Sequence, residues 1–302
     1  MILEGATLRA EVRPEAGGSV VSLRHLSSGA EVLARTPWEA EPASGEPAPD
    51  EASWLARWPG GWPIMFPNAG DAGAGHGFHG EGSVAPWEVT WDGAALVLRR
   101  RFRSVPAQMT RRLRIDGDRL LVEEEAVADL SCEVAWGEHV TLGSDLLAGP
   151  VRLRASAARA AACAHYAPPA SPLRPGAEGD WPLLPGREGP ADLSRPAEGL
   201  AMLASLHDLG PDPWVEVARE DGSLAVRLDW SADPWPLAWL WVETGGTPDA
   251  PWLGRGRCLG VEPCTTWPAT GRARAPSEGG RLLPLRPGEA RRGRIALRVF
   301  QP

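Results

Sequence analysis

The sequence of 302 residues contains no lysine, so all 31 of its basic residues are arginine. Schiff-base catalysis, an internal aldimine with pyridoxal phosphate and a Walker-type phosphate loop each require a lysine amine, so these chemistries are excluded. The formal net charge is -8 at pH 7 and the pI is near 5.4. A nucleic-acid-binding surface needs clustered basic residues, so we expect no nucleic-acid partner.

Cysteines and long apolar runs are also scarce. The four cysteines (Cys132, Cys163, Cys258 and Cys264) form no Cys-x-x-Cys pair and have no histidine at a finger-like distance, which predicts buried thiols and no structural zinc. No segment approaches ~18 uninterrupted apolar residues, and the first ten residues lack the basic and apolar regions of a signal peptide. We therefore expect a cytoplasmic protein with no membrane partner.

Short alternating segments dominate what is present. Half-buried β-strands are predicted at residues 96–103, 120–127, 151–154, 224–230 and 294–300. The Asp-Gly pairs at residues 92–93, 116–117 and 221–222 predict tight hairpin turns between such strands. The pattern favours an all-β fold of stacked antiparallel sheets with few short helices, one of which is possible at the alanine-rich residues 155–163.

Two stretches interrupt this pattern, at residues 38–61 and 167–199, and both are rich in Pro, Gly, Ala and Glu. They are interpreted either as long surface loops with no packed structure or as the rims of a binding cleft. Neither has the character of a domain linker, because the candidate site residues fall on both sides of the second stretch. We therefore expect one domain over residues 1–302.

One glutamate and two histidines are the candidate catalytic residues. Glu262 lies in an apolar run before a proline, His79 in the segment His-Gly-Phe-His-Gly, and His139 in the segment Trp-Gly-Glu-His-Val. A carboxylate and imidazoles that folding brings together can remove a proton from one oxygen while delivering another nearby. A histidine in an all-β protein is more often structural, so each of these residues has to be judged in its context.

Five motifs in order supply that context. They are residues 60–70 (GGWPIMFPNAG), His79-Gly80 with Pro86-Trp87, Gly137-Glu-His139, residues 236–241 (PLAWLW) and Gly260-Val-Glu-Pro263. Together they resemble the aldose 1-epimerase (galactose mutarotase) superfamily over roughly residues 17–300. The resemblance implies a β-supersandwich of antiparallel sheets whose concave face binds a monosaccharide.

The resemblance also implies roles for individual residues. His139 resembles the general acid that protonates the ring oxygen, Glu262 the general base that takes the anomeric hydroxyl proton, and His79 a second histidine that binds near the ring oxygen. Asn68 matches the asparagine of a proline-asparagine turn. These roles need neither a metal nor any other cofactor, because proton transfer suffices. The implied activity is interconversion of the α and β anomers of a free or weakly substituted aldose.

Further substrate-binding candidates are His76, Trp241 and Asp208. His76 is predicted to be a turn residue or a partner of the site. Trp241 can stack on a sugar ring, as can Trp62 and Trp267, although core packing also accounts for any single tryptophan. Asp208 stands for the family's sugar-binding aspartate, and Asp229 and Asp233 are alternatives.

The sequence also departs from the family pattern. Ala69 and Ser83 stand where many relatives, or the phosphate-handling branch, carry arginine, so a neutral aldose is predicted over its 6-phosphate. Arginines near the motifs that folding can aim at the cleft are Arg57, Arg111, Arg255 and Arg257. Two alternatives stay open: a catalytically silent sugar-binding or regulatory relative, and an epimerase or isomerase of a modified sugar. Either a monomer or a homodimer is expected.

Overall fold

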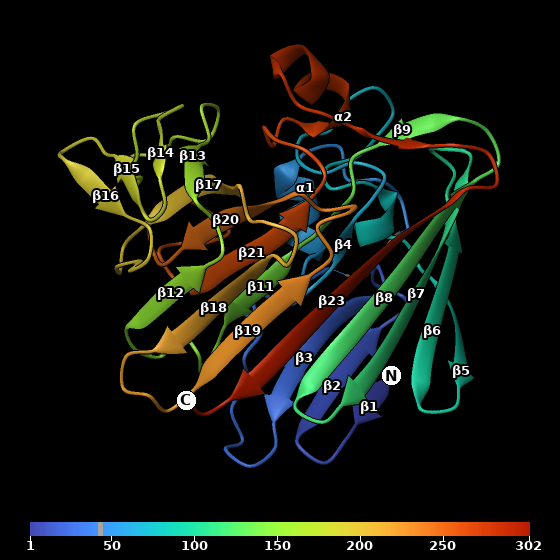
Figure 1. Cartoon of the computed structure of the whole chain (residues 1–302), viewed down its shortest axis with the longest axis horizontal. Coiled ribbons are helices and arrows are strands. Elements are labelled where there is room, and N and C mark those ends of the chain that lie inside the picture. The colour runs from blue at the N-terminus through green and yellow to red at the C-terminus, as the bar shows by residue number, and fades with distance from the viewer. Residues whose placement is uncertain (42–44) are drawn as a thin grey trace.

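Two eight-stranded antiparallel sheets form the body of the protein. The computed structural model describes residues 1–41 and 45–302. The first sheet has the strand order β12-β18-β19-β23-β8-β7-β6-β5 and crosses the front of the molecule from left to right (Figure 1). Its strands, in that order, are Val151–Ala155, Trp214–Arg219, Ala225–Trp230, Ala290–Phe300, Arg119–Ala128, Ala107–Asp116, Ala95–Arg101 and Glu88–Asp92.

The second sheet lies behind the first and carries the candidate catalytic residues. Its order is β14-β13-β17-β20-β21-β10-β4, and β11 also pairs with β21. These strands are, in that order and ending with β11, Glu178–Asp180, Arg159–Ala162, Ala201–His207, Leu237–Glu243, Cys258–Cys264, Gly137–Glu138, Ile64–Met65 and Val140–Gly143. All seven residues of β21 are buried, so this central strand is covered on both faces.

Smaller sheets and helices complete the fold. The sheets are β1-β2-β3 (Ile2–Glu4, Leu8–Arg13, Ser19–His25), β15-β16 (Leu183–Pro185, Pro190–Asp192) and β9-β22 (Cys132–Val134, Leu283–Leu285). The helices are α1 (Glu51–Arg57), α2 (Gly271–Arg274) and the 3₁₀ turns η1 (Glu81–Ser83) and η2 (Ala275–Glu278). None of the helices in the described part of the chain is long and apolar enough to cross a membrane.

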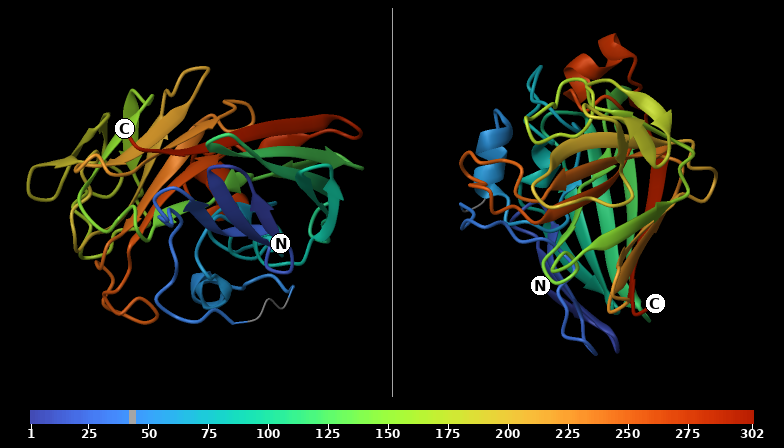
Figure 2. Two further views of the ribbon diagram at one scale, coloured as in Figure 1. Left: turned by 90° about the horizontal axis from the view of Figure 1, so that it is seen from below. Right: turned by 90° about the vertical axis from the view of Figure 1, so that its left-hand side faces the viewer.

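Helix α1 lies on the side of the second sheet that faces away from the first (Figure 2, right). It begins after Asp50, whose carboxylate accepts a hydrogen bond of 2.8 Å from the backbone N–H of Ser53 and so caps the first turn. Glu51 in the first turn and Arg57 in the last turn complement the helix dipole. The helix buries Trp54 and Leu55 toward the sheet.

The main core fills the space between the two sheets, and it contains a buried ionic cluster. Arg111 on β7 lies beside Glu124 on β8 and donates a hydrogen bond of 2.9 Å to Glu138 on β10, and all three side chains are fully buried. The indole N–H groups of Trp62 and Trp136 donate to Glu138 and Glu124 at 2.6 and 3.0 Å. The cluster therefore links β7 and β8 of the first sheet to β10 of the second sheet, and His139 directly follows β10.

The predicted strands and hairpins are confirmed. Each predicted segment overlaps an observed strand, and the three Asp-Gly pairs join β5 to β6, β7 to β8 and β18 to β19. Their glycines have positive φ angles of 60°, 60° and 71°, as tight turns require. The possible helix at residues 155–163 is wrong, because β12 ends and β13 begins there and the alanines pack into sheets. The single domain over residues 1–302 stays a prediction.

The two irregular stretches have different structures. Residues 38–61 contain α1, and residues 42–44 of this stretch lie outside the described residues. Residues 167–199 contain β14, β15 and β16, so the expectation of a loop with no packed structure is wrong for part of each stretch. Helix α1 supplies one wall of the cavity described below, whereas no residue between 167 and 199 lines it.

Candidate active site

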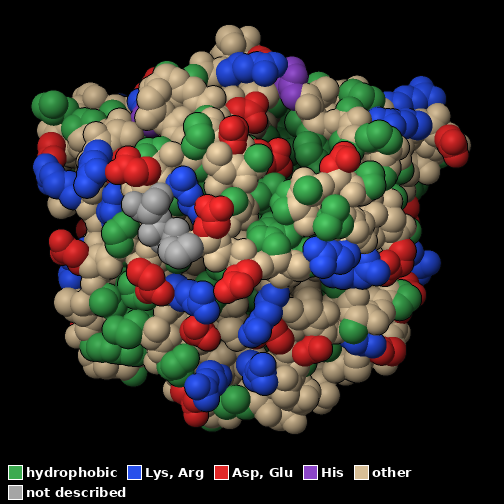
Figure 3. Space-filling view, turned by 180° about the vertical axis from the view of Figure 1, so that it is seen from behind, with side chains coloured by type: hydrophobic (Ala, Val, Ile, Leu, Met, Phe, Trp, Pro, Cys, Tyr) green, Lys and Arg blue, Asp and Glu red, His purple; other side chains and the backbone are tan. Residues whose placement is uncertain are grey.

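A cavity of about 180 Å³ opens on the face that carries α1. This face is hollowed in its upper half, where acidic side chains surround hydrophobic ones (Figure 3). Glu262, His139 and His79 all line the cavity. The other residues of its wall are Glu51, Trp54, Leu55, Gly70, Asp71, Phe78, Cys163, His165, Tyr166, Leu203, Trp239, Trp241, Ala269 and Thr270.

Glu262 occupies the floor of this cavity. It lies on the buried strand β21 opposite Trp239 of β20, and its side chain is 2% exposed. Its carboxyl oxygen Oε1 has no hydrogen-bond partner among the described residues. Burial raises the pKa of the Glu262 carboxyl well above its usual value. Gly260 leaves room for this side chain, because a Cβ at that position would lie 2.2 Å from Oε1.

His139 faces Glu262 from the neighbouring strands. Its Nε2 atom is 3.6 Å from Oε1 of Glu262, and its side chain is 6% exposed. Its Nδ1 atom lies 2.7 Å from the hydroxyl of Thr141. The same hydroxyl donates to the carbonyl oxygen of His139 at 3.4 Å, so it accepts a hydrogen bond from Nδ1–H, and the lone pair of Nε2 faces Glu262. Burial lowers the pKa of His139 to about 4, so the ring is neutral at pH 7.

The backbone explains why His139 points into the cavity. His139 lies between β10 and β11, and its backbone N–H donates to the carbonyl of Pro63 at 3.0 Å. Successive side chains of extended chain point to opposite faces. Glu138 therefore enters the buried ionic cluster between the sheets, while His139 enters the cavity.

His79 is the third candidate catalytic residue that lines the cavity. The backbone N–H of Gly70 donates to its Nδ1 atom at 3.1 Å, which places the ring proton on Nε2. The ring centroids of His79 and His139 are 5.2 Å apart. Burial and, to a lesser extent, the neighbouring His139 lower the pKa of His79 well below its usual value. His79 also has a φ of 55°, an uncommon backbone conformation for a histidine.

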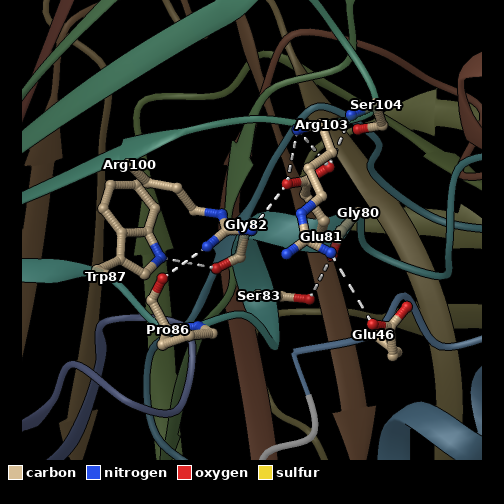
Figure 4. Close-up of polar contacts among 10 residues, drawn as sticks. All are labelled: Glu46, Gly80, Glu81, Gly82, Ser83, Pro86, Trp87, Arg100, Arg103 and Ser104. Carbon is tan, nitrogen blue, oxygen red and sulfur yellow. Dashed lines mark hydrogen bonds and ion pairs between the residues drawn. The ribbon is translucent and has the colours of Figure 1, made fainter.

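The turn after His79 is held by the carboxylate of Glu81. This carboxylate accepts hydrogen bonds from the backbone N–H groups of Arg103 and Ser104 and from the guanidinium of Arg100 (Figure 4). Burial by itself would raise the pKa of Glu81, but these hydrogen bonds lower it below its usual value. Gly80 has a φ of 74°, and a Cβ there would lie 2.4 Å from the carbonyl oxygen of Phe66. A fixed turn thus supports the unusual backbone of His79.

Asn68 organises the loop that leads to His79 and does not line the cavity. Its amide nitrogen donates to the carbonyls of Gly70, Asp71 and Gly77, and its oxygen accepts from the backbone N–H of Arg272 at 2.6 Å. These bonds occupy the polar atoms of the side chain. The structure therefore gives Asn68 contacts that position Gly70 and Asp71.

The remaining predicted site residues lie in different places. Trp241 lines the cavity, and its ring centroid is 5.8 Å from that of His139. His76 lies outside the cavity lining and contacts the guanidinium of Arg272. Burial and then the charge of Arg272 lower the pKa of His76. Asp208 follows the end of β17 and does not line the cavity.

Trp54 on α1 is the main site residue that the sequence analysis missed. Its ring packs edge-on against His79 with a centroid distance of 4.7 Å, and it lies 5.4 Å from the ring of His139. Its indole N–H donates to the hydroxyl of Ser83 at 3.0 Å. The signal for this wall was present in the sequence, because Asp50, Glu51 and Arg57 are an N-cap, a first-turn acid and a last-turn base of a short helix.

Solved structures with the same architecture are found across bacteria. The Slr1438 protein of Synechocystis sp. PCC 6803 matches with a TM-score of 0.68 at 18% identity, covering 100% of this chain and 96% of that one. A galactose mutarotase related enzyme from Lactobacillus acidophilus has a TM-score of 0.64 at 14% identity, with 99% and 97% covered. A galactose mutarotase-like protein from Lactobacillus casei has a TM-score of 0.64 at 15% identity, with 99% of each chain covered.

The chain has the galactose mutarotase-like fold. The all-β supersandwich predicted from the sequence is therefore confirmed. No family model matches the sequence, and no curated protein matches it. Identities of 14% to 18% establish the fold alone.

Ala69 and Ser83, which stand where relatives are expected to carry arginine, are both buried in this mutarotase-like fold. Ala69 is fully buried, and the hydroxyl of Ser83 donates to the carbonyl of Gly80 while it accepts from Trp54. Among the described residues that line the cavity, none is an arginine. Arg57 and Arg257 contact backbone carbonyls elsewhere, and Arg111 belongs to the buried ionic cluster.

The cavity brings together side chains that can accept and donate protons. In the described part of the chain, no three His, Cys, Asp or Glu side chains are grouped as metal ligands would be. Glu262 and His139 instead approach each other with one unpartnered oxygen and one ring nitrogen. This arrangement can accept a proton from one substrate oxygen and deliver a proton to a second oxygen close to it.

Proposed function

We propose that the protein is an aldose 1-epimerase that interconverts the α and β anomers of a monosaccharide. The observation that carries the proposal is the unpartnered Oε1 atom of Glu262, buried 3.6 Å from Nε2 of His139 at the floor of a cavity. A buried carboxyl oxygen without a hydrogen bond is costly, and a substrate hydroxyl would supply the missing partner. The fold shared with a galactose mutarotase related enzyme and a galactose mutarotase-like protein, at 14% and 15% identity, supports the same proposal.

Glu262 and His139 can exchange protons with the two oxygens bonded to the anomeric carbon, the anomeric hydroxyl and the ring oxygen. Glu262 removes the proton from the anomeric hydroxyl as the bond between C1 and the ring oxygen breaks. The bond's electron pair stays on the ring oxygen, which receives a proton from Nε2 of His139, and the open-chain aldehyde results. After rotation about the C1–C2 bond, the former ring hydroxyl attacks the other face of C1, its proton returns to His139, and Glu262 returns its proton to the anomeric oxygen.

This cycle needs one proton on the pair of side chains. Burial raises the pKa of Glu262 and lowers that of His139. In the empty cavity both side chains are therefore neutral, and the proton resides on Glu262. Hydrogen bonds from a bound sugar stabilise the charged forms, and the proton of Glu262 moves to the lone pair of Nε2 of His139. Since the two groups interact, they titrate as a pair that keeps one proton between the two pKa values.

The rest of the cavity fits one sugar ring. At roughly 30 Å³ per water molecule, a volume of about 180 Å³ holds about six waters, which is the scale of a single sugar ring. Trp241 and Trp54 offer aromatic surfaces to the C–H groups of a pyranose. His79, with its proton on Nε2, supplies a neutral hydrogen-bond donor for the substrate beside His139.

Anomeric equilibration of pure α-anomers of glucose, galactose, mannose and xylose, followed by polarimetry and NMR, tests the proposal. The protein should accelerate equilibration of at least one aldose above the buffer-catalysed rate. Binding of the same sugars is measured in parallel by quenching of tryptophan fluorescence. Saturable binding without acceleration would favour the alternative, a catalytically silent sugar-binding relative.

A further inference from the structure

The charge of the cavity wall has one sign. Three carboxyl groups line the cavity, those of Glu51, Asp71 and Glu262, and in the empty cavity Glu262 holds a proton. No guanidinium group stands opposite them among the described lining residues, and the chain has no lysine. The view of this face shows acidic side chains grouped around the hollow (Figure 3).

Two of these carboxylates mark the mouth of the cavity. Glu51 and Asp71 are exposed residues, whereas Glu262 is buried at the floor. Neither mouth carboxylate has a hydrogen-bond or ion-pair partner among the described residues. Burial and then the charge of Asp71 raise the pKa of Glu51, which shows that the two carboxylates act on each other through space.

The nearest cation does not neutralise the mouth. Partial burial raises the pKa of Asp71, and Arg274 and then His165 lower it by less. The guanidinium of Arg274 is bound by the carboxylate of Glu278 at 2.6 Å and contacts His165. The pair of carboxylates at the mouth therefore keeps an excess of negative charge.

The unpartnered buried oxygen of Glu262 fixes how a sugar would enter. It requires a ligand hydroxyl at the floor, and in the proposed reaction this is the anomeric hydroxyl. The ring oxygen then lies toward His139. The atoms of a pyranose opposite the anomeric carbon and the ring oxygen are C4 and C3, so their substituents point to the mouth.

We propose that the preferred substrate is an aldose with a cationic amino group at C3 or C4, which the carboxylates of Glu51 and Asp71 bind at the mouth. This inference rests on the proposed function, because the proposed reaction sets the orientation of the ring. An ammonium group keeps part of its hydration at an exposed mouth, so its desolvation cost is small. Two exposed ion pairs are worth roughly a 3- to 30-fold preference at low salt, and the preference falls as salt rises.

The test compares 3-amino-3-deoxyglucose with glucose, which has a hydroxyl in place of the ammonium group. Both kcat/KM for anomeric equilibration and Kd from tryptophan fluorescence are measured at pH 7, where an amine with a pKa of ~7.7–8.0 is mostly protonated. The protein should prefer the amino sugar about 3- to 30-fold at low salt, and the ratio should shrink in about 0.5 M NaCl. Glucosamine, with its ammonium group beside the anomeric carbon, should show a smaller preference.

Variants of the two mouth carboxylates test whether they cause the preference for the amino sugar. The double variant Glu51→Gln/Asp71→Asn should bring the ratio between amino sugar and glucose close to 1. Glu188→Gln removes one charge from an exposed loop remote from the cavity lining and should leave the ratio unchanged. If the double variant is unstable, the salt dependence of the ratio in the wild-type protein decides the same question.

The outcomes separate the inference from the proposed function. Tighter binding of the amino sugar without any equilibration would support the cationic subsite and contradict the epimerase activity. Equilibration of both sugars with a ratio near or below 1 at low salt would support the activity and overturn the inference. An equal preference for glucosamine would also overturn it, because the protein would then respond to overall charge and not to charge at the mouth.

Discussion

Replacing Glu262 with glutamine should abolish most of the activity while making the protein more stable. The amide is nearly isosteric with the carboxyl group but cannot accept a proton at neutral pH. Loss of a general base costs about 100- to 10,000-fold in kcat. At 1.36 kcal/mol per tenfold change, this is about 2.7 to 5.4 kcal/mol of transition-state stabilisation.

The gain in stability follows from the burial of this carboxyl group. Its pKa is raised in the folded protein, so between its unfolded and folded pKa values the folded state binds more protons than the unfolded state. Stability of the wild-type protein therefore falls as pH rises through this interval, at up to about 1.4 kcal/mol per pH unit. Glutamine does not titrate, so the variant's advantage should be absent near pH 4 and grow as the pH rises above the unfolded pKa of about 4.3, until the folded carboxyl group ionises.

Polarimetry and thermal unfolding at several pH values measure both effects. Glu243→Gln is the matched control, because Glu243 is equally buried on the adjacent strand β20 but accepts hydrogen bonds from the backbone N–H groups of Gly245 and Thr247. This control should lower Tm and leave kcat within about twofold, since loss of a partnered buried group costs ~1–3 kcal/mol. A Glu262→Gln protein that equilibrates anomers at the wild-type rate, or whose Tm advantage does not depend on pH, would refute the reasoning.

Three further predictions concern the other walls of the cavity. His139→Asn should mainly lower kcat, because it removes an interaction made in the transition state. His79→Asn should both raise KM and lower kcat, because it also removes a contact that binds the substrate. Steady-state kinetics measures both effects. Trp54→Ala should admit water to the rings of His79 and His139 and so raise the pKa of His139 from about 4 toward its usual value, which NMR titration measures. The same substitution should lower the free energy of unfolding by ~3–5 kcal/mol. A neutral aldose should have a higher kcat/KM than its 6-phosphate at fixed ionic strength, because a phosphate dianion meets carboxylates and no described arginine at the cavity wall.

Each of these predictions has an outcome that contradicts it. Equal kinetic effects of the two histidine substitutions would remove the distinction between their roles. An unchanged histidine titration in Trp54→Ala would show that other residues exclude water from the site. A clear preference for the phosphate would mean that an arginine moves into the cavity when the substrate binds.

The sequence determined much of the fold through local rules. Alternation of side chains and Asp-Gly turns specify hairpins such as β7-β8, because burial of one strand face and a positive φ at the turn act over a few neighbouring residues. The missing lysine, a property of composition, removed whole classes of chemistry in the same way. At residues 155–163 the local rule failed, since the alanines there are neutral between helix and strand and the neighbouring strands decide.

Only the tertiary structure decided how the site is built. It brought Glu262 within 3.6 Å of His139, assigned the polar atoms of Asn68 to a loop, and left Asp208 away from the cavity. It also placed Trp54 of a short helix against two histidines distant in sequence. Contacts of this kind depend on how separate sheets and loops pack together, and the burial that shifts the pKa values of Glu262 and His139 exists only after that packing. The sequence could therefore name the reactive groups, while their distances, their protonation and the acidic mouth around them are properties of the folded chain.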